Sequence, residues 1–355
     1  MNNKERGKRI RLQIVRDVKC HSNDIAKHIG KIFSITPQAV NSHIKRLEKE
    51  ERISSTGIGK GKRYFLGDVR QNLGLFPLTE DIAEDKVWRD HFSFIFEGMP
   101  ENIVDICHYG FTEMVNNVID HSGGKELYVS LFRDRTNIII SVMDDGEGIF
   151  RKIERMCGLT DERQALLELS KGKLTTDPDN HTGEGIFFTS RVFDKFEIAS
   201  KGIEYSHDHS KKFDYIDDSV IPRERIGTLV YMLIDRESRR KTQDVFDEFT
   251  AGPEEFQFNK TIIPVRLAQY KNEKLVSRSQ AKRLLARIEN FENVIFDFKE
   301  VKSIGQAFAD EIFRVYQQRH PGIVLLPMYM EKDVEKMVNK AIAARERTVN
   351  GGGSH

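Results

Sequence analysis

Three polar residues stand four positions apart in the segment 112–121: Glu113, Asn117 and His121. On a helix this spacing places all three on one face, while the apolar residues between them lie toward the other. A carboxylate on such a face can orient or deprotonate a water molecule, and a neutral amide oxygen is a suitable ligand for Mg²⁺. The segment therefore predicts a helix with a polar face turned toward a bound group.

A second polar motif follows an apolar run at 137–143, which reads as a strand joined by a hairpin to an earlier strand at 127–132. Asp144 stands at the end of this run and offers an acceptor suited to the exocyclic amine of adenine. Gly146 and Gly148 come next, and glycines let the backbone turn and approach a ligand closely. A turn with an acidic residue and glycines is common after strands. This motif therefore indicates a nucleotide site only together with the other motifs of the chain.

Two further motifs complete an ordered set. Thr182, Gly183 and Gly185 open an apolar helix, an arrangement suited to cradling phosphate with backbone N–H groups. Thr228 stands at the start of the last predicted strand of this region. Its hydroxyl can hydrogen-bond to the same edge of a base as Asp144. The polar segment 171–182 precedes the second glycine motif, and long polar loops in compact domains are usually functional or disordered.

The order and spacing of these motifs resemble the GHKL ATPase superfamily, most nearly its compact anti-sigma-factor-like members, over residues 95–236. The resemblance implies ATP and Mg²⁺ as ligands, with Glu113 as general base, Asn117 on the metal and Asp144 on adenine. It also implies nucleotide contacts from Gly146, Gly148, Lys173, Thr182, Gly183, Gly185 and Thr228. Lys171 is an alternative to Lys173 in the segment that would form the ATP lid. Phe187 replaces the third glycine expected in the second box.

The N-terminal region carries most of the positive charge. Residues 1–67 hold 16 Lys and Arg against 6 Asp and Glu, a balance of +10, and the remainder of the chain sums to −9. Helices predicted at 4–18, 25–33 and 38–50, followed by two strands around a Gly/Lys tip, resemble a winged helix-turn-helix. The resemblance implies double-stranded DNA contacts from Gln38, Asn41, Ser42, Lys45, Lys60, Lys62 and Arg63. A protein-interaction module is the alternative for such a unit.

The C-terminal region alternates predicted strands and helices over 254–346, a pattern typical of a separate small α/β domain. The stretch 293–312 resembles a STAS-like domain, a fold in which a serine after a strand accepts phosphate. Here Ala307 falls at that position, with Ser303 nearby, so phosphorylation there is not expected. A protein partner for this domain is possible.

Other stretches bear on location and on metal binding. The three cysteines are far apart in the sequence, and no apolar run is long enough to span a membrane, so a cytoplasmic protein is expected. The segment 206–210 is interpreted as an exposed hairpin loop rather than a metal site. His121 is assigned to helix packing, and Trp88 to anchoring a helix on the core. Residues 351–355 are interpreted as a tag remnant.

The sequence thus predicts a multidomain α+β protein. The expected parts are a winged helix at 1–68, a connector helix region at 69–94 that leads into a helix at 86–96, a GHKL α/β sandwich at 95–240 and a STAS-like domain at 254–346. The expected function is ATP-dependent regulation of DNA or partner binding in a homodimer, with slow Mg²⁺-dependent ATP hydrolysis. Two alternatives remain: an anti-sigma-type protein serine/threonine kinase, and an ATP-gated sensor of a stress or phage-defence system.

Overall fold

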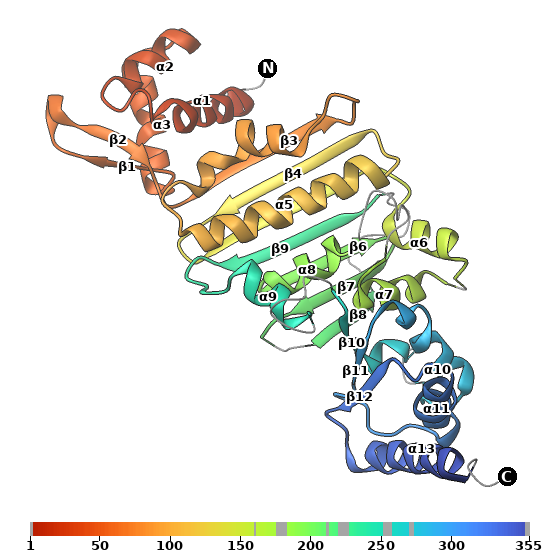
Figure 1. Cartoon of the computed structure of the whole chain (residues 1–355). Helices are drawn as coiled ribbons and strands as arrows, with labels where there is room; N and C mark the ends of the chain where they lie inside the picture. The colour runs from red at the N-terminus through yellow and green to blue at the C-terminus, as the bar shows by residue number, and fades with distance from the viewer. Residues whose placement is uncertain are drawn as a thin grey trace.

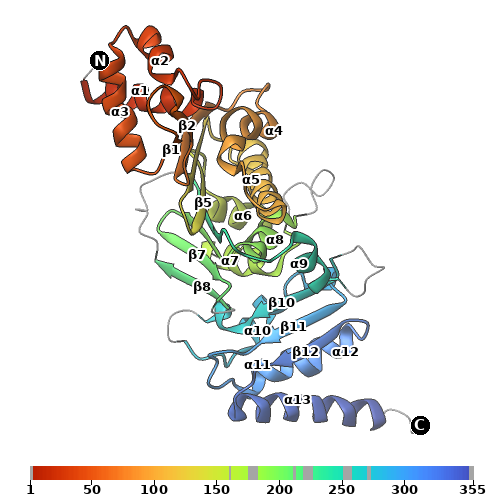
Figure 2. The same ribbon diagram turned by 90° about the vertical axis from the view of Figure 1, so that its left-hand side faces the viewer.

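The computed structural model describes residues 3–159, 161–174, 183–210, 213–218, 227–250, 258–269 and 273–351. It is a mixed α/β structure whose described strands form sheets of two, seven and three strands. The N-terminal helices and the C-terminal unit lie at opposite ends of the molecule, with the seven-stranded sheet between them (Figures 1 and 2). Among the described residues, no helix is both long and apolar enough to cross a membrane.

The N-terminal unit has its own hydrophobic core, built around Ile14, Ile29 and Val40. Its elements are α1 (Asn3–Asp17), α2 (Ile25–Phe33), α3 (Pro37–Lys49), β1 (Ile53–Thr56), the 3-10 turn η1 (Gly59–Gly61) and β2 (Arg63–Leu66). The Thr36 hydroxyl accepts a hydrogen bond from the Ala39 N–H at 3.2 Å, and a proline at the next position starts α3. β1 and β2 pair antiparallel, as the Gly/Lys tip predicts.

The central sheet is antiparallel throughout its described pairings. Its order is β3 (Arg70–Pro77), β4 (Glu126–Arg133), β5 (Asn137–Asp144), β9 (Leu229–Asp235), β6 (Lys195–Ser200), β7 (Ile203–Asp208) and β8 (Phe213–Asp218). Alternate side chains of β4 and β5 are buried, and α5 (Glu101–His121) crosses the sheet on that face (Figure 1). The helices α8 (Gly185–Val192) and α9 (Thr242–Glu248) lie beside it.

Strand β3 corrects the prediction that 69–94 is only a connector. Its two leucines, Leu73 and Leu75, remain 75% and 55% exposed, so the segment shows no buried apolar face by which a strand is recognised. Pairing with β4, more than fifty residues later, makes it the edge of the central sheet. The sequence cannot reveal such a partner in advance.

The second half of the connector is helical, as predicted. It comprises α4 (Glu84–Val87), the π-helical turn η2 (Trp88–Phe92) and the 3-10 turn η3 (Ser93–Phe96). Trp88 is 8% exposed and its ring lies 4.6 Å from that of Phe96 and 5.0 Å from that of Phe111 on α5. These contacts confirm that Trp88 anchors the segment on the core.

The C-terminal unit contains a parallel sheet, in the order β10 (Lys260–Pro264), β11 (Asn293–Asp297) and β12 (Val324–Met328). Its other elements are η4 (Val265–Ala268), α10 (Arg278–Leu285), η5 (Ile288–Asn290), α11 (Gln306–Asp310), η6 (Glu311–Tyr316), α12 (Gln317–Arg319) and α13 (Lys332–Gly351). The alternation of strand and helix follows the prediction. Its core is continuous with that of the central sheet, since Phe258 contacts both Phe187 of α8 and Phe291.

The segment 206–210 is not simply an exposed loop. His207 belongs to β7, is 7% exposed and lies 2.6 Å from Asp214 of β8, which also pairs with Arg191 of α8 at 2.9 Å. Burial lowers the pKa of His207. No group of three or more His, Cys, Asp or Glu suited to a metal occurs in the described part of the chain.

Candidate functional site

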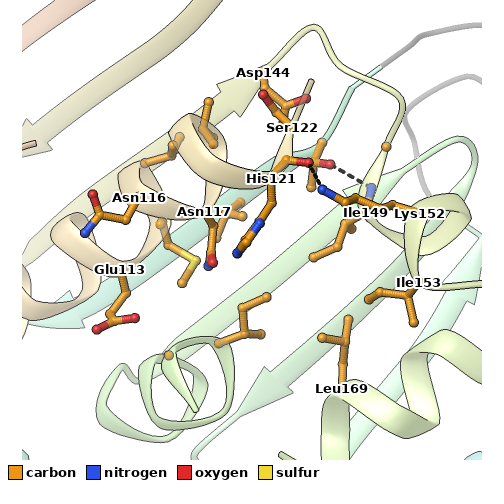
Figure 3. A pocket seen from close by; sticks show the side chains of 18 of the residues that line it. Glu113, Asn116, Asn117, His121, Ser122, Asp144, Ile149, Lys152, Ile153 and Leu169 are labelled. Carbon is orange, nitrogen blue, oxygen red and sulfur yellow. Dashed lines mark hydrogen bonds between the residues drawn. The ribbon is translucent and has the colours of Figure 1, made fainter. Parts of the chain in front are cut away.

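A cavity of about 320 Å³ lies at the C-terminal half of α5. It is bounded by α5, the end of β5, the loop after it, α6 (Ile149–Cys157), α7 (Glu162–Lys171) and the start of α8 (Figure 3). The residues predicted from the sequence that line it are Glu113, Asn117, Asp144, Gly148, Gly183, Gly185 and Thr228. Four separate motifs, spread over more than a hundred residues, therefore meet at one site.

Asp144 lies at the end of β5 and is only 5% exposed. Its carboxylate accepts a hydrogen bond from the Gly146 N–H at 2.7 Å, and the Thr228 hydroxyl also bonds to it. Burial raises the pKa of Asp144, and hydrogen bonds from the backbone of Gly146 and of Thr228 and from the Thr228 hydroxyl partly offset the effect. Gly146 does not line the cavity, but it contributes through this bond.

The glycines beside Asp144 permit close packing of the backbone. A Cβ on Gly146 would overlap the Ser122 carbonyl oxygen at the end of α5. A Cβ on Gly227 would overlap the carbonyl oxygen of Asp144, and Gly227 also has a φ of +92°. These positions accept only glycine because side chains there would push the strand ends apart.

Thr228 fixes the start of α6. Its hydroxyl oxygen accepts a hydrogen bond from the Ile149 N–H at 3.0 Å, and its carbonyl accepts one from the Asp144 N–H at 3.1 Å. Gly148, with a φ of +90°, makes the turn between β5 and α6. Strand end, turn and helix start are thus held as one rigid wall of the cavity.

The other wall carries the polar stripe of α5. The Asn117 Nδ2 is buried and has no hydrogen-bond partner among the described residues, although the amide faces the cavity (Figure 3). The Glu113 carboxylate lies against the start of α8, where a Cβ on Gly185 would overlap it. The N-terminus of a helix has positive potential, so this position favours a carboxylate and would equally favour a phosphate.

Magnesium fits this donor set in a limited way. Mg²⁺ keeps several waters and needs only one or two protein ligands when a phosphate chain supplies the others. Asn117 lines the cavity, and its amide oxygen is the group that would bind the metal. Its buried Nδ2, which has no partner among the described residues, is a donor and is suited to an acceptor such as a phosphate oxygen. Asn117 is therefore the residue that would hold the metal.

Two predicted lysines lie elsewhere. The Lys173 Nζ donates to the Asn290 carbonyl at 3.0 Å and lies over the Phe291 ring, outside the cavity lining. Lys171 is 1% exposed and pairs with Glu168, so neither lysine is placed to contact phosphate. The sequence placed both lysines in the predicted ATP lid, whereas in the structure they bond to the C-terminal unit. Thr182 lies outside the described residues.

Lys152 and His121 are two polar lining residues that the sequence did not assign to the site. Lys152 of α6 is the one Lys or Arg among the described residues of the cavity wall, and its Nζ donates to the His121 carbonyl at 2.6 Å (Figure 3). Burial lowers its pKa. The His121 side chain also lines the cavity, so helix packing is not its whole role. The helical phase of Ile149, Lys152 and Ile153 was the available signal for Lys152.

The predicted DNA-contact residues lie on α3 and on the segment from η1 to β2 of the N-terminal unit. Gln38, Asn41, Ser42 and Lys45 are exposed on α3, and Arg63 is exposed on β2. Lys62 instead pairs with Glu48 at 3.1 Å, which reduces its availability. The Lys60 side chain lies outside the described part of the structure.

Comparison with known proteins identifies the C-terminal unit. Residues 280–335 match a STAS-like domain of unknown function (DUF4325), which confirms the STAS-like prediction for this part of the chain. The match lies within the predicted range 254–346 and covers α10 through the start of α13. A search of the curated proteins found no match to the chain.

Proposed function

We propose that the chain is an ATP-dependent regulator of DNA binding, with a GHKL-type central domain and an N-terminal winged helix. The observation that carries the proposal is the convergence of Asn117, Asp144 and Gly185 on one cavity. An acceptor at a strand end, an amide oxygen on a helix and a glycine-flanked helix N-terminus are the groups that adenine, a metal and phosphate respectively need.

Each wall of the cavity has a distinct task in this proposal. The Asp144 carboxylate accepts a hydrogen bond from the exocyclic amine of adenine, and the Thr228 hydroxyl bonds to the same edge of the base. The apolar side chains of Leu169 and Ile153 cover the base. Lys152, now bonded to a carbonyl, supplies positive charge toward the nucleotide. Bound Mg²⁺ would neutralise charge on the phosphates. Glu113 would orient the attacking water, accepting its proton as the bond to the γ-phosphate forms.

We expect Asn117→Ala to weaken Mg²⁺-ATP binding about ten-fold, because the metal loses its protein ligand. The affinity for ATP with EDTA should change by less than two-fold. Titration of a fluorescent ATP analogue with and without Mg²⁺ measures both values. Asn116→Ala is a matched control one residue away: Asn116 also lines the cavity, but the proposal gives it no contact with the metal. Equal losses with and without Mg²⁺ would show that Asn117 does not act through the metal.

DNA binding is expected from the exposed face of α3. Lys45→Ala should weaken binding to double-stranded DNA several-fold. The slope of log K against log salt concentration should also fall in magnitude by about 1, since one phosphate contact is lost. Filter binding from about 50 to 200 mM salt measures this. Lys49→Ala, at the far end of the same helix, is the control for a general loss of charge. Absence of DNA affinity for the wild type at about 50 mM salt would remove the DNA part of the proposal.

A homodimer is part of the proposal because winged helices usually read paired half-sites. ATP binding would change the geometry of the pair and so the spacing of the two α3 helices. The central sheet lies between the N-terminal unit and the C-terminal unit, which supports a role in transmitting such a change (Figures 1 and 2). Sedimentation with and without Mg²⁺-ATP measures the oligomeric state.

A further inference from the structure

Helix α7 belongs to two parts of the molecule. On one side its Leu169 lines the cavity, and Leu174 lines it just beyond the helix end. On the other side α7 packs against β10 of the C-terminal unit, which we call the STAS-like unit (Figure 2). No residue of α10 or β10 lines the cavity among the described residues, so any effect of the cavity on that unit must pass through an intervening element such as α7.

Lys171, at the end of α7, is the centre of this contact. Its Nζ donates to Glu168 at 2.7 Å, to the Ala286 carbonyl at 2.7 Å and to the Arg283 carbonyl at 3.3 Å. Arg283 lies in the last turn of α10 and Ala286 caps that helix. The carbonyl groups at a helix C-terminus carry negative potential, which favours a cation there. Lys171 is buried, so the contact is specific rather than a mobile surface pair.

Two further bonds hold the same end of α7. The Thr261 hydroxyl of β10 donates to the Lys171 carbonyl at 2.7 Å, and Thr261 is fully buried. The Lys173 Nζ donates to the Asn290 carbonyl at 3.0 Å. The Lys171 carbonyl and the side chains of Lys171 and Lys173 are therefore all bonded to the STAS-like unit. The next residue, Leu174, returns to the cavity and its N–H donates to the Gly183 carbonyl at 3.2 Å.

We propose that Lys171 and Thr261 form a latch through which the STAS-like unit positions the wall of the nucleotide cavity. This inference rests on the proposed function and adds regulation to it. A partner that displaces the STAS-like unit would release α7 and weaken nucleotide binding. By linkage, nucleotide binding stabilises the docked position of the STAS-like unit by the same factor. Lys171 is a positioning residue here, since it does not itself reach the cavity.

The test uses Thr261→Val, which removes the hydroxyl bond with little change in volume. Thr189→Val is the matched control, because Thr189 is equally buried, its hydroxyl has no partner among the described residues and it does not line the cavity. Affinity for a fluorescent ATP analogue should fall about five-fold in Thr261→Val and stay unchanged in Thr189→Val. Lys171→Met, if it folds, should show a larger loss.

Hydrogen exchange tests whether nucleotide binding is coupled to the STAS-like unit, as distinct from a general change in the stability of the protein. In the wild type, Mg²⁺-ATP should slow the exchange of amides in α10, Arg278–Leu285, at least two-fold. This slowing should persist in Thr189→Val and disappear in Thr261→Val. If ATP binds but leaves α10 exchange unchanged, the latch is overturned and the proposed function stands. If Thr261→Val keeps both wild-type affinity and wild-type slowing, the latch is also overturned. If the wild type binds no ATP, both proposals fail.

Discussion

Replacing Asp144 by alanine should lower the affinity for ATP about 10- to 100-fold. The buried carboxylate is the acceptor for the adenine amine in our proposal, and a hydrogen bond to a charged group contributes about 1.5 to 3 kcal/mol. The same change removes the acceptor of the Gly146 N–H, which loosens the turn after β5. Isothermal titration with ATP measures the loss, and circular dichroism shows whether the variant remains folded.

Two comparisons make this result specific. Asp105→Ala changes an exposed carboxylate on α5 outside the cavity lining and should leave the affinity unchanged. Lowering the pH should weaken wild-type binding, because protonation removes an acceptor. Since burial raises the pKa of Asp144, this loss should begin at a higher pH than for an ordinary aspartate. Undiminished ATP binding by Asp144→Ala would place adenine elsewhere.

The second large effect is expected on hydrolysis. Glu113→Gln should reduce the rate of phosphate release by about 10² to 10⁴, because a positioned general base contributes that factor. ATP affinity should change little, since an amide fits the same space beside Gly185. A coupled assay of phosphate release under saturating ATP, with binding measured separately, distinguishes chemistry from affinity.

A matched comparison is Glu101→Gln, which alters an exposed glutamate in the first turn of the same helix and should leave hydrolysis unaffected. Radiolabelled γ-phosphate adds a second readout. Label recovered on protein instead of as free phosphate would favour the kinase alternative. If Glu113→Gln releases phosphate at the wild-type rate, the assignment of Glu113 as general base is wrong.

The sequence was most informative where local rules dominate. The spacing of Glu113 and Asn117 on a helix, the glycines after β5 and the cap of α3 at Thr36 depend on neighbours within a few residues. The alternation of strands and helices predicted the C-terminal unit for the same reason, and its STAS-like character is confirmed over 280–335. Such features can be predicted because short-range geometry determines them.

Long-range contacts decided the remainder. Strand β3 exists because β4 accepts it as a partner, although its own leucines stay exposed. The imidazole of His207 can be buried because it hydrogen-bonds to Asp214 on the next strand. The Asp214 carboxylate is in turn paired with Arg191 on a helix. Neither set of partners can be identified from the residues next to 73 or 207. Strand β4 begins 49 residues after the end of β3 (126 − 77), and Asp214 and Arg191 lie on separate elements, 7 and 16 residues from His207.

The cavity shows the same division. The sequence by itself predicted Glu113, Asn117 and Asp144 as site residues from their types and spacing, and all three line the cavity. Only the tertiary structure decided that Lys152 lines the cavity while Lys171 and Lys173 turn to the STAS-like unit. A lysine side chain is long and flexible, so the packing of other elements around it determines which acceptor it meets.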